Sequence, residues 1–199
     1  MLPTALAVQE LRKQLRRQRA RLPQAQQQFY SKQAVRQLSR HRLFRSARNI
    51  ALYLPVRGEA DPRPLLKSAH AKQRFFLPVL SLSRNSTLIF VEWNSQTRFR
   101  NNRFNIPEPV LARRSILSPR QLDLVISPLV AFDKQGSRLG MGGGFYDRSF
   151  AFKHRVKHPK PALLGFAYPF QQVNCLERQT WDIPLDGCCT ADGLVLYKP

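Results

Sequence analysis

The residues best suited to chemistry lie in one stretch, DKQGSRLGMGGGFYDRSF (133–150). Four of the chain's nine glycines occupy five consecutive positions there, from Gly140 to Gly144, with only Met141 among them. Arg138 stands just before these glycines. Glycines let backbone N–H groups approach an anion and adopt positive φ, and an arginine can bind phosphate oxygens through two donors. The stretch therefore favours a phosphate-binding site.

Asp147 follows the glycines, in the first turn of a predicted helix. A carboxylate beside bound phosphates adds repulsion unless it holds Mg²⁺ between the protein and the anion. The pattern is thus typical of a nucleotide triphosphate site with a metal. A flexible surface turn is the alternative for a glycine cluster. Neither the Lys-Ser/Thr pair of a P-loop nor a dinucleotide-binding fingerprint is present.

A buried strand must precede such glycines, and a helix must follow them. The run LDLVISPLVAFD (122–133) predicts the strand, and the spacing after Gly144 predicts a helix to about His154. Helices are expected at 5–21, 24–44 and 61–72, strands at 49–56, 74–80, 86–93, 161–168 and 193–199, and a loop at 94–115. The apolar stripe of the second helix would comprise Phe29, Ala34, Val35, Leu38 and Leu43.

This alternation of apolar strands with helices predicts an α/β fold. We expect an open, mostly parallel sheet flanked by helices in a three-layer arrangement. The whole chain, 1–199, would form a single domain with basic helices at its N-terminus.

The charge is strongly positive, with 33 Lys and Arg against 12 Asp and Glu, a net +21. Residues 1–48 hold twelve basic residues and a single acid, Glu10, so they carry +11 of that charge. Such a balance indicates an anionic partner. A nucleic-acid-binding protein is the alternative from another class, but no such motif is present and no aromatic residues alternate with the basic run.

The three cysteines form no spaced framework, and Cys188 and Cys189 are adjacent. The three cysteines predict a reducing compartment, and we expect Cys188 and Cys189 to pack in a buried segment. The longest apolar runs are far shorter than the ~20 residues that span a bilayer, and no signal sequence precedes the first helix. We therefore expect a soluble, cytoplasmic protein without membrane contact.

The stretch ISPLVAFDKQGSRLGMGGGFYDRSF resembles the signature of the 5-formyltetrahydrofolate cyclo-ligase family, also called 5,10-methenyltetrahydrofolate synthetases. Four other segments resemble the family in the same order: LRKQLRRQR (11–19), IALYLPVRGEADP (50–62), NIPEP (105–109) and WDIPLD (181–186). The likeness thus covers essentially the whole chain. One departure is Met141 with the two glycines after it, where some members carry basic residues, so backbone amides would contact phosphate there.

This resemblance implies an enzyme that uses ATP and Mg²⁺ to convert 5-formyltetrahydrofolate into 5,10-methenyltetrahydrofolate, ADP and phosphate. The formyl oxygen would attack the γ-phosphorus, N10 would attack the activated carbon, and phosphate would leave. The protein would act by positioning and charge stabilisation, without a covalent catalytic residue. A monomer acting on folate, including polyglutamylated folate, is expected. An ATP-dependent kinase or ligase for another substrate is the nearer alternative.

The resemblance also implies the site residues. The ATP-binding set is Arg12, Lys13, Arg16, Arg138, Leu139, Gly140, Met141, Gly142, Gly143, Gly144, Phe145 and Tyr146. The folate-binding set is Leu54, Glu59, Met141, Gly142, Gly143, Gly144 and Phe145, and the metal ligands are Asp147 and Asp182. From the residues alone, a solvated face is the favoured interpretation of the three basic residues of the first helix. Asp182 could equally be a turn aspartate, and Tyr146 a core residue.

Overall fold

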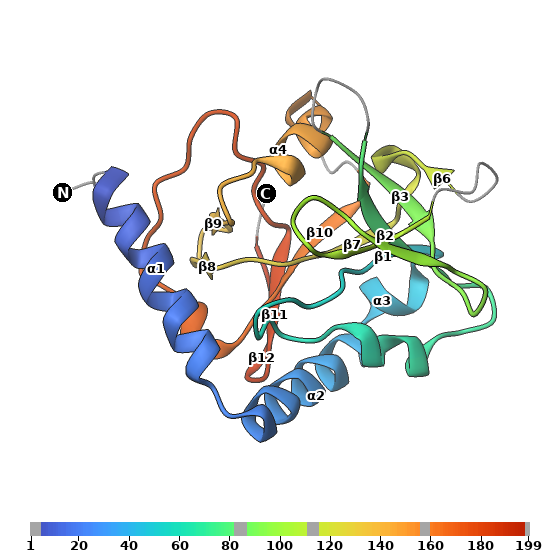
Figure 1. Ribbon diagram of the computed structural model, residues 1–199, viewed down its shortest axis with the longest axis horizontal. Coiled ribbons are helices and arrows are strands. Elements are labelled where there is room, and N and C mark those ends of the chain that lie inside the picture. The colour runs from blue at the N-terminus through green and yellow to red at the C-terminus, as the bar shows by residue number, and fades with distance from the viewer. Residues whose placement is uncertain (1–4, 82–86, 111–115, 156–159, 198–199) are drawn as a thin grey trace.

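The computed structural model of the protein describes residues 5–81, 87–110, 116–155 and 160–197 (Figure 1). In these ranges an eight-stranded sheet has the order β12-β11-β10-β7-β1-β2-β3-β6. Its strands are β1 (Asn49–Ala51), β2 (Arg74–Leu80), β3 (Leu88–Glu92), β6 (Ile116–Leu117), β7 (Leu124–Ser127), β10 (Ala162–Phe166), β11 (Gly187–Thr190) and β12 (Gly193–Leu196). Two small hairpins accompany it, β4 (Phe99–Asn101) with β5 (Pro107–Pro109) and β8 (Ala131–Phe132) with β9 (Arg138–Leu139).

The five central strands, β11, β10, β7, β1 and β2, are parallel, and antiparallel strands extend both edges. The described helices are α1 (Ala5–Arg21), α2 (Gln24–Arg40), α3 (Arg42–Ser46) and α4 (Phe145–Phe150). Short 3₁₀ helices are η1 (Arg63–Ser68), η3 (Pro119–Gln121), η4 (Ala151–Arg155) and η5 (Pro169–Gln171). This arrangement confirms the predicted α/β fold with a mostly parallel sheet.

Alternate side chains of the central strands pack on opposite faces, as the pleat requires. Leu124 and Ile126 of β7 join the core beneath α2 and α3, whereas Val125 joins the core that contains Phe150 of α4. Cys189 belongs to the first core and the adjacent Cys188 to the second, which confirms that both pack inside the protein. The sheet therefore lies between two apolar layers.

Helix α1 lies apart from the sheet, beside the β8–β9 hairpin (Figure 1). Its Leu15 packs in a small core of its own with Val130, Ala131 and Leu176, and Leu139 lies against this core. The helix is thus attached to the segment that leads into the glycines, not to the sheet. Among the described helices, none is long and apolar enough to cross a bilayer.

Several element boundaries differ from the sequence expectations. The strand expected over 122–133 leaves the sheet after Ser127, because Pro128 cannot donate a ladder hydrogen bond, and β8 follows as part of a hairpin. The loop expected over 94–115 contains β4 and β5, and its residues 111–115 lie outside the described residues.

The helical predictions were too long in two places. The helix expected over 24–44 breaks at His41, whose Nδ1 accepts a hydrogen bond from the backbone N–H of Leu43 and caps α3. The helix expected over 61–72 is only the 3₁₀ turn η1. Phe29, placed in the apolar stripe of α2, is 57% exposed, whereas Ser31 is buried in that stripe.

Candidate functional site

The sheet reverses its direction of winding between β1 and β7. After β1 the chain forms β2 on one side, then returns to form β7 on the other side and continues to β10 and β11. Ligands of open α/β sheets bind outside the carboxyl ends of the strands at such a switch point. Glu59 follows β1 and the glycine stretch follows β7, so the two segments singled out by sequence flank this point.

The glycine loop requires glycine at specific positions. Gly142 has φ +95° and Gly144 has φ +62°, a region that residues with a Cβ rarely occupy. Gly144 directly precedes α4, and Met141, Gly142 and Gly143 are exposed. Because α4 has only six residues, backbone N–H groups of the loop, rather than a long helix dipole, would be the main anion ligands.

Arg138 and Asp147, the charges on either side of the glycines, form an ion pair across the loop. Arg138 also donates to the backbone carbonyl of Ile183, and its side chain is only 6% exposed. The Oδ1 atom of Asp147 accepts a second hydrogen bond, 3.1 Å long, from the N–H of Ile183. The pair therefore joins the glycine loop to the WDIPLD segment, and phosphate binding by Arg138 stays a prediction.

The two predicted metal ligands lie on these joined segments, since Asp182 precedes Ile183 in the chain. Oδ2 of Asp182 accepts a hydrogen bond from the N–H of Gln179 at 2.8 Å. Across the described residues, no three His, Cys, Asp or Glu side chains gather into a metal site. Mg²⁺ in nucleotide enzymes usually takes one or two carboxylates and completes its shell with phosphates and water. The carboxylates of Asp147 and Asp182 therefore suit a Mg²⁺ ion that is shared with bound phosphates and water. They do not suit an ion that is held by protein side chains alone.

Glu59 lies at the end of a tight turn after β1. The N–H of Glu59 donates to Val56 O at 3.1 Å, and the two residues between them, Arg57 and Gly58, both have positive φ. In return, Glu59 Oε2 accepts from Val56 N–H at 3.1 Å. Burial raises the pKa of Glu59, whereas the positive charge of Arg19 acts to lower it. The turn thus holds a buried carboxyl group whose charge depends on its neighbours.

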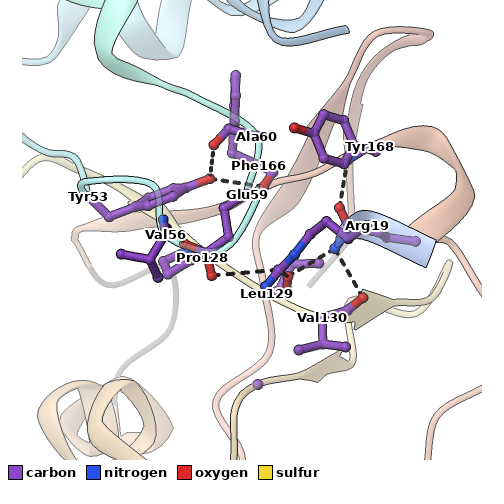
Figure 2. A network of polar contacts seen from close by, with 12 residues as sticks. Arg19, Tyr53, Val56, Glu59, Ala60, Pro128, Leu129, Val130, Phe166 and Tyr168 are labelled. Atoms are coloured by element: carbon purple, nitrogen blue, oxygen red, sulfur yellow. Dashed lines mark hydrogen bonds and ion pairs between the residues drawn. The ribbon is translucent and has the colours of Figure 1, made fainter. Parts of the chain in front are cut away.

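Arg19 of α1 is the neighbour that faces this carboxyl group. Its Nη1 lies 3.5 Å from Glu59 Oε1 and 3.5 Å from the carbonyl oxygen of Leu129, which follows β7 (Figure 2). Tyr53, on the chain after β1, donates through its hydroxyl to Ala60 O at 2.5 Å and approaches Phe166 O of β10 at 3.4 Å. Figure 2 therefore shows segments from three neighbouring parallel strands and from α1 meeting around Glu59.

Arg12 connects the same helix to the glycine loop, because its Nε donates to Gly140 O at 2.9 Å. Arg16, one turn further along, is half-buried, whereas Lys13 is 57% exposed and pairs with Glu10 at 3.8 Å. The structure thus brings Arg12 to the predicted loop and leaves Lys13 on the open face of α1. Nucleotide contacts from all three stay predictions.

The other predicted residues surround the loop. Leu139 packs against the core beneath α1, and Phe145 lies against Phe104 at the tip of the β4–β5 hairpin, with ring centres 6.1 Å apart. Tyr146 stacks on Phe150, and burial, followed by the nearby Glu59 charge, raises its pKa. Met141 is 45% exposed on the loop, and Leu54 is half-buried against the core beneath α2.

Sequence reasoning missed two features of this site. In the sequence Arg19 is one of many residues in a basic run, although its spacing of seven residues from Arg12 places both on one face of α1. The backbone of Ile183, which binds both charges of the glycine loop, carries no side-chain signal and could not be found from residue types.

Comparisons with known proteins identify relatives of this chain. Residues 6–191 match the model of the 5-formyltetrahydrofolate cyclo-ligase family. The 5-formyltetrahydrofolate cyclo-ligase of Escherichia coli K12 is 38% identical over 177 residues, 88% of this chain and 96% of that protein. The Haemophilus influenzae enzyme of the same name is 39% identical over 180 residues, 89% and 94% of the two chains.

A solved structure agrees with these sequence matches. The NMR structure of Aquifex aeolicus 5,10-methenyltetrahydrofolate synthetase superimposes with a TM-score of 0.79 at 30% identity, and covers 96% of this chain and 93% of that one. These findings favour an enzyme over the nucleic-acid-binding alternative.

Proposed function

Because the chain belongs to the 5-formyltetrahydrofolate cyclo-ligase family, we propose that it converts 5-formyltetrahydrofolate into 5,10-methenyltetrahydrofolate at the expense of ATP. The observation that carries this proposal is that two loops follow neighbouring strands at the switch point. The glycine loop after β7 suits phosphates, and the buried Glu59 after β1 suits the paired N–H donors of a pterin. We propose further that 1–199 act as one cytoplasmic domain.

The chemistry that these residues have to support is a phosphoryl transfer followed by ring closure. The formyl oxygen attacks the γ-phosphorus of ATP and ADP leaves, so that the formyl carbon gains a good leaving group. N10 then attacks that carbon, and phosphate departs with the former formyl oxygen. In this scheme the chain supplies no nucleophile. Its backbone N–H groups in the glycine loop orient the phosphates, and Glu59 orients the pterin.

Asp147 and Asp182 are the residues that would hold a magnesium ion in this site. When bound, Mg²⁺ would neutralise charge on the nucleotide phosphates. Arg138 would orient Asp147 through their ion pair, and Ile183 N–H would fix the same carboxylate from the other side. The chain thus positions the carboxylate before any nucleotide arrives.

The direct test is to mix purified protein with Mg-ATP and 5-formyltetrahydrofolate and to follow methenyl absorbance in the near ultraviolet. An absorbance rise that needs both ATP and protein is expected. If the absorbance does not rise but the protein consumes ATP when a different acceptor is supplied, the protein is instead a kinase or ligase of another substrate.

Asp147→Asn tests the role of the carboxylate. Asparagine keeps an oxygen that can accept from Ile183 N–H but removes the negative charge, so turnover should fall by about 100-fold or more. Asp192→Asn removes the same charge from an exposed position in the turn between β11 and β12 and serves as the matched control. Turnover by Asp147→Asn equal to that of the control would refute the metal role.

A further inference from the structure

The inner face of α1 contacts both loops of the site. Arg12 and Arg19 are seven residues apart, about 10 Å along the helix, so they project from the same side. Arg12 binds Gly140 O in the glycine loop, and Arg19 faces Glu59 in the other loop. Leu15, between them on this face, is 5% exposed and packs against Val130 and Ala131. One helix thus joins the two predicted substrate subsites.

A backbone contact shows independently that the end of α1 is seated on the Glu59 turn. A Cβ added at Gly58 would stand 3.2 Å from the carbonyl oxygen of Arg19, closer than most side chains tolerate. Gly58 also has φ +75°, so both its space and its conformation disfavour other residues. The guanidinium of Arg19 therefore approaches Glu59 from a fixed helix terminus.

The energetics of this ion pair argue against a purely stabilising role. The side chains of Arg19 and Glu59 are 2% and 7% exposed, and the Nε of Arg19 has no hydrogen-bond partner within the described ranges. Removing two charges and one unpaired donor from water costs free energy that their attraction seldom exceeds. An apolar pair would serve stability as well. The presence of these two charged side chains therefore needs an explanation other than stability.

The contacts of Glu59 do not use all the acceptor positions of its carboxylate. An ionised carboxylate offers about four such positions. Here Val56 N–H occupies one on Oε2, and Arg19 Nη1 forms an ion pair with Oε1 at 3.5 Å. The remaining positions can accept donors from a bound molecule while Arg19 stays in place.

We propose that Arg19 is a positioning residue for substrate binding: it keeps the buried Glu59 ionised and aimed so that Glu59 can accept the N–H donors of the pterin ring. This inference rests on the proposed function, since it takes the pterin as the partner of Glu59. Arg19 itself touches no substrate in this account and acts only through the carboxylate.

The central experiment compares Arg19→Met with Arg17→Met in the full-length protein. Arg17 is exposed on the opposite side of α1, so its replacement removes the same charge from the same helix. For Arg19→Met, the KM for 5-formyltetrahydrofolate should rise at least about tenfold, whereas the KM for ATP should change less than about threefold. Arg17→Met should leave both unchanged. An equal rise in both KM values for Arg19→Met would overturn the proposal.

The conservative variant and a double mutant separate positioning from folding. Arg19→Lys keeps a positive charge near Glu59 and should restore part of the lost folate affinity in a protein with unchanged thermal stability. In a Glu59→Gln background, which has no carboxylate to orient, Arg19→Lys should cost nothing further. Additive losses in the double mutant would contradict the proposal.

The ionisation of Glu59 gives a readout that does not depend on the substrate. The groups facing this carboxyl are Arg19 from α1, Tyr146 from α4, Tyr168 after β10, and Tyr53 and Arg57 from its own segment. Removing the positive charge in Arg19→Met should move the ¹³C-detected titration of Glu59 to higher pH, whereas Arg19→Lys, which keeps that charge, should move it less. The acidic limit of activity should move the same way. An unchanged Glu59 titration overturns this inference, whereas a shifted titration without folate turnover would contradict only the proposed function.

Discussion

At the residue scale, the glycines between Arg138 and Asp147 differ in how strictly their positions require glycine. That requirement depends on backbone angles, which residue types do not reveal. Gly142 and Gly144 have positive φ, whereas Gly140 does not, and a Cβ at Gly140 would meet nothing within 4 Å. Charge neighbours were also hidden, since the Arg138–Asp147 pair forms only when the loop folds back.

This difference predicts unequal effects on stability. Gly142→Ala should lower the free energy of unfolding by about 1–3 kcal/mol, because alanine is strained at φ +95°. Gly140→Ala places its methyl group in open space without that strain and should leave the unfolding free energy unchanged or slightly raised. Urea unfolding of both variants measures the unfolding free energy. Equal losses for the two variants would contradict the prediction, because they would show that the positive φ of Gly142 adds no strain.

At the element scale, apolar periodicity found the long elements and failed on the short ones. Helix α1 and strand β2 have the predicted boundaries. Strand β11, with the sequence GCCT, was not expected, because four residues without a β-branched run give no pattern until neighbouring strands pair with them. The β8–β9 hairpin was likewise hidden within what read as one apolar strand.

The buried face of α2 predicts which of its side chains hold the helix in place. Leu38 is fully buried in the core beneath α2 and α3, so Leu38→Ala should lower the unfolding free energy by about 2–5 kcal/mol. Phe29→Ala removes a larger side chain from an exposed position and should change it by less than about 0.5 kcal/mol. Thermal or urea unfolding distinguishes these values. A loss for Phe29→Ala as large as that for Leu38→Ala would mean that Phe29 belongs to the buried stripe after all.

At the scale of the whole molecule, the net charge of +21 exceeds what the contacts of the site use. Few of the basic residues on α1 lie near the loops, and several, such as Arg17 and Arg21, are exposed. A positive field of this size accelerates the capture of anions over distances of about 8 Å at physiological salt. ATP and polyglutamylated folate are both anions, which gives the surplus charge a role within the proposed function.

Salt dependence tests that role. The KM for a polyglutamylated 5-formyltetrahydrofolate should rise with ionic strength more steeply than the KM for the monoglutamate, since each added carboxylate gains from the field. Steady-state kinetics in increasing potassium chloride measures both slopes. Equal slopes would show that the excess charge does not act on the glutamate tail.

The way in which α1 is attached predicts how the protein unfolds locally. This helix packs mainly on a small core of its own, which shares Phe170 with the core beneath α2, so we expect it to detach while most of the two larger cores stays packed. Its amide hydrogens should therefore exchange with solvent deuterium as one cooperative unit, earlier than those of β7 and β10. Because its arginines contact both loops of the site, the protection of these amides should increase when ligands bind, so that α1 reports on the occupancy of the site.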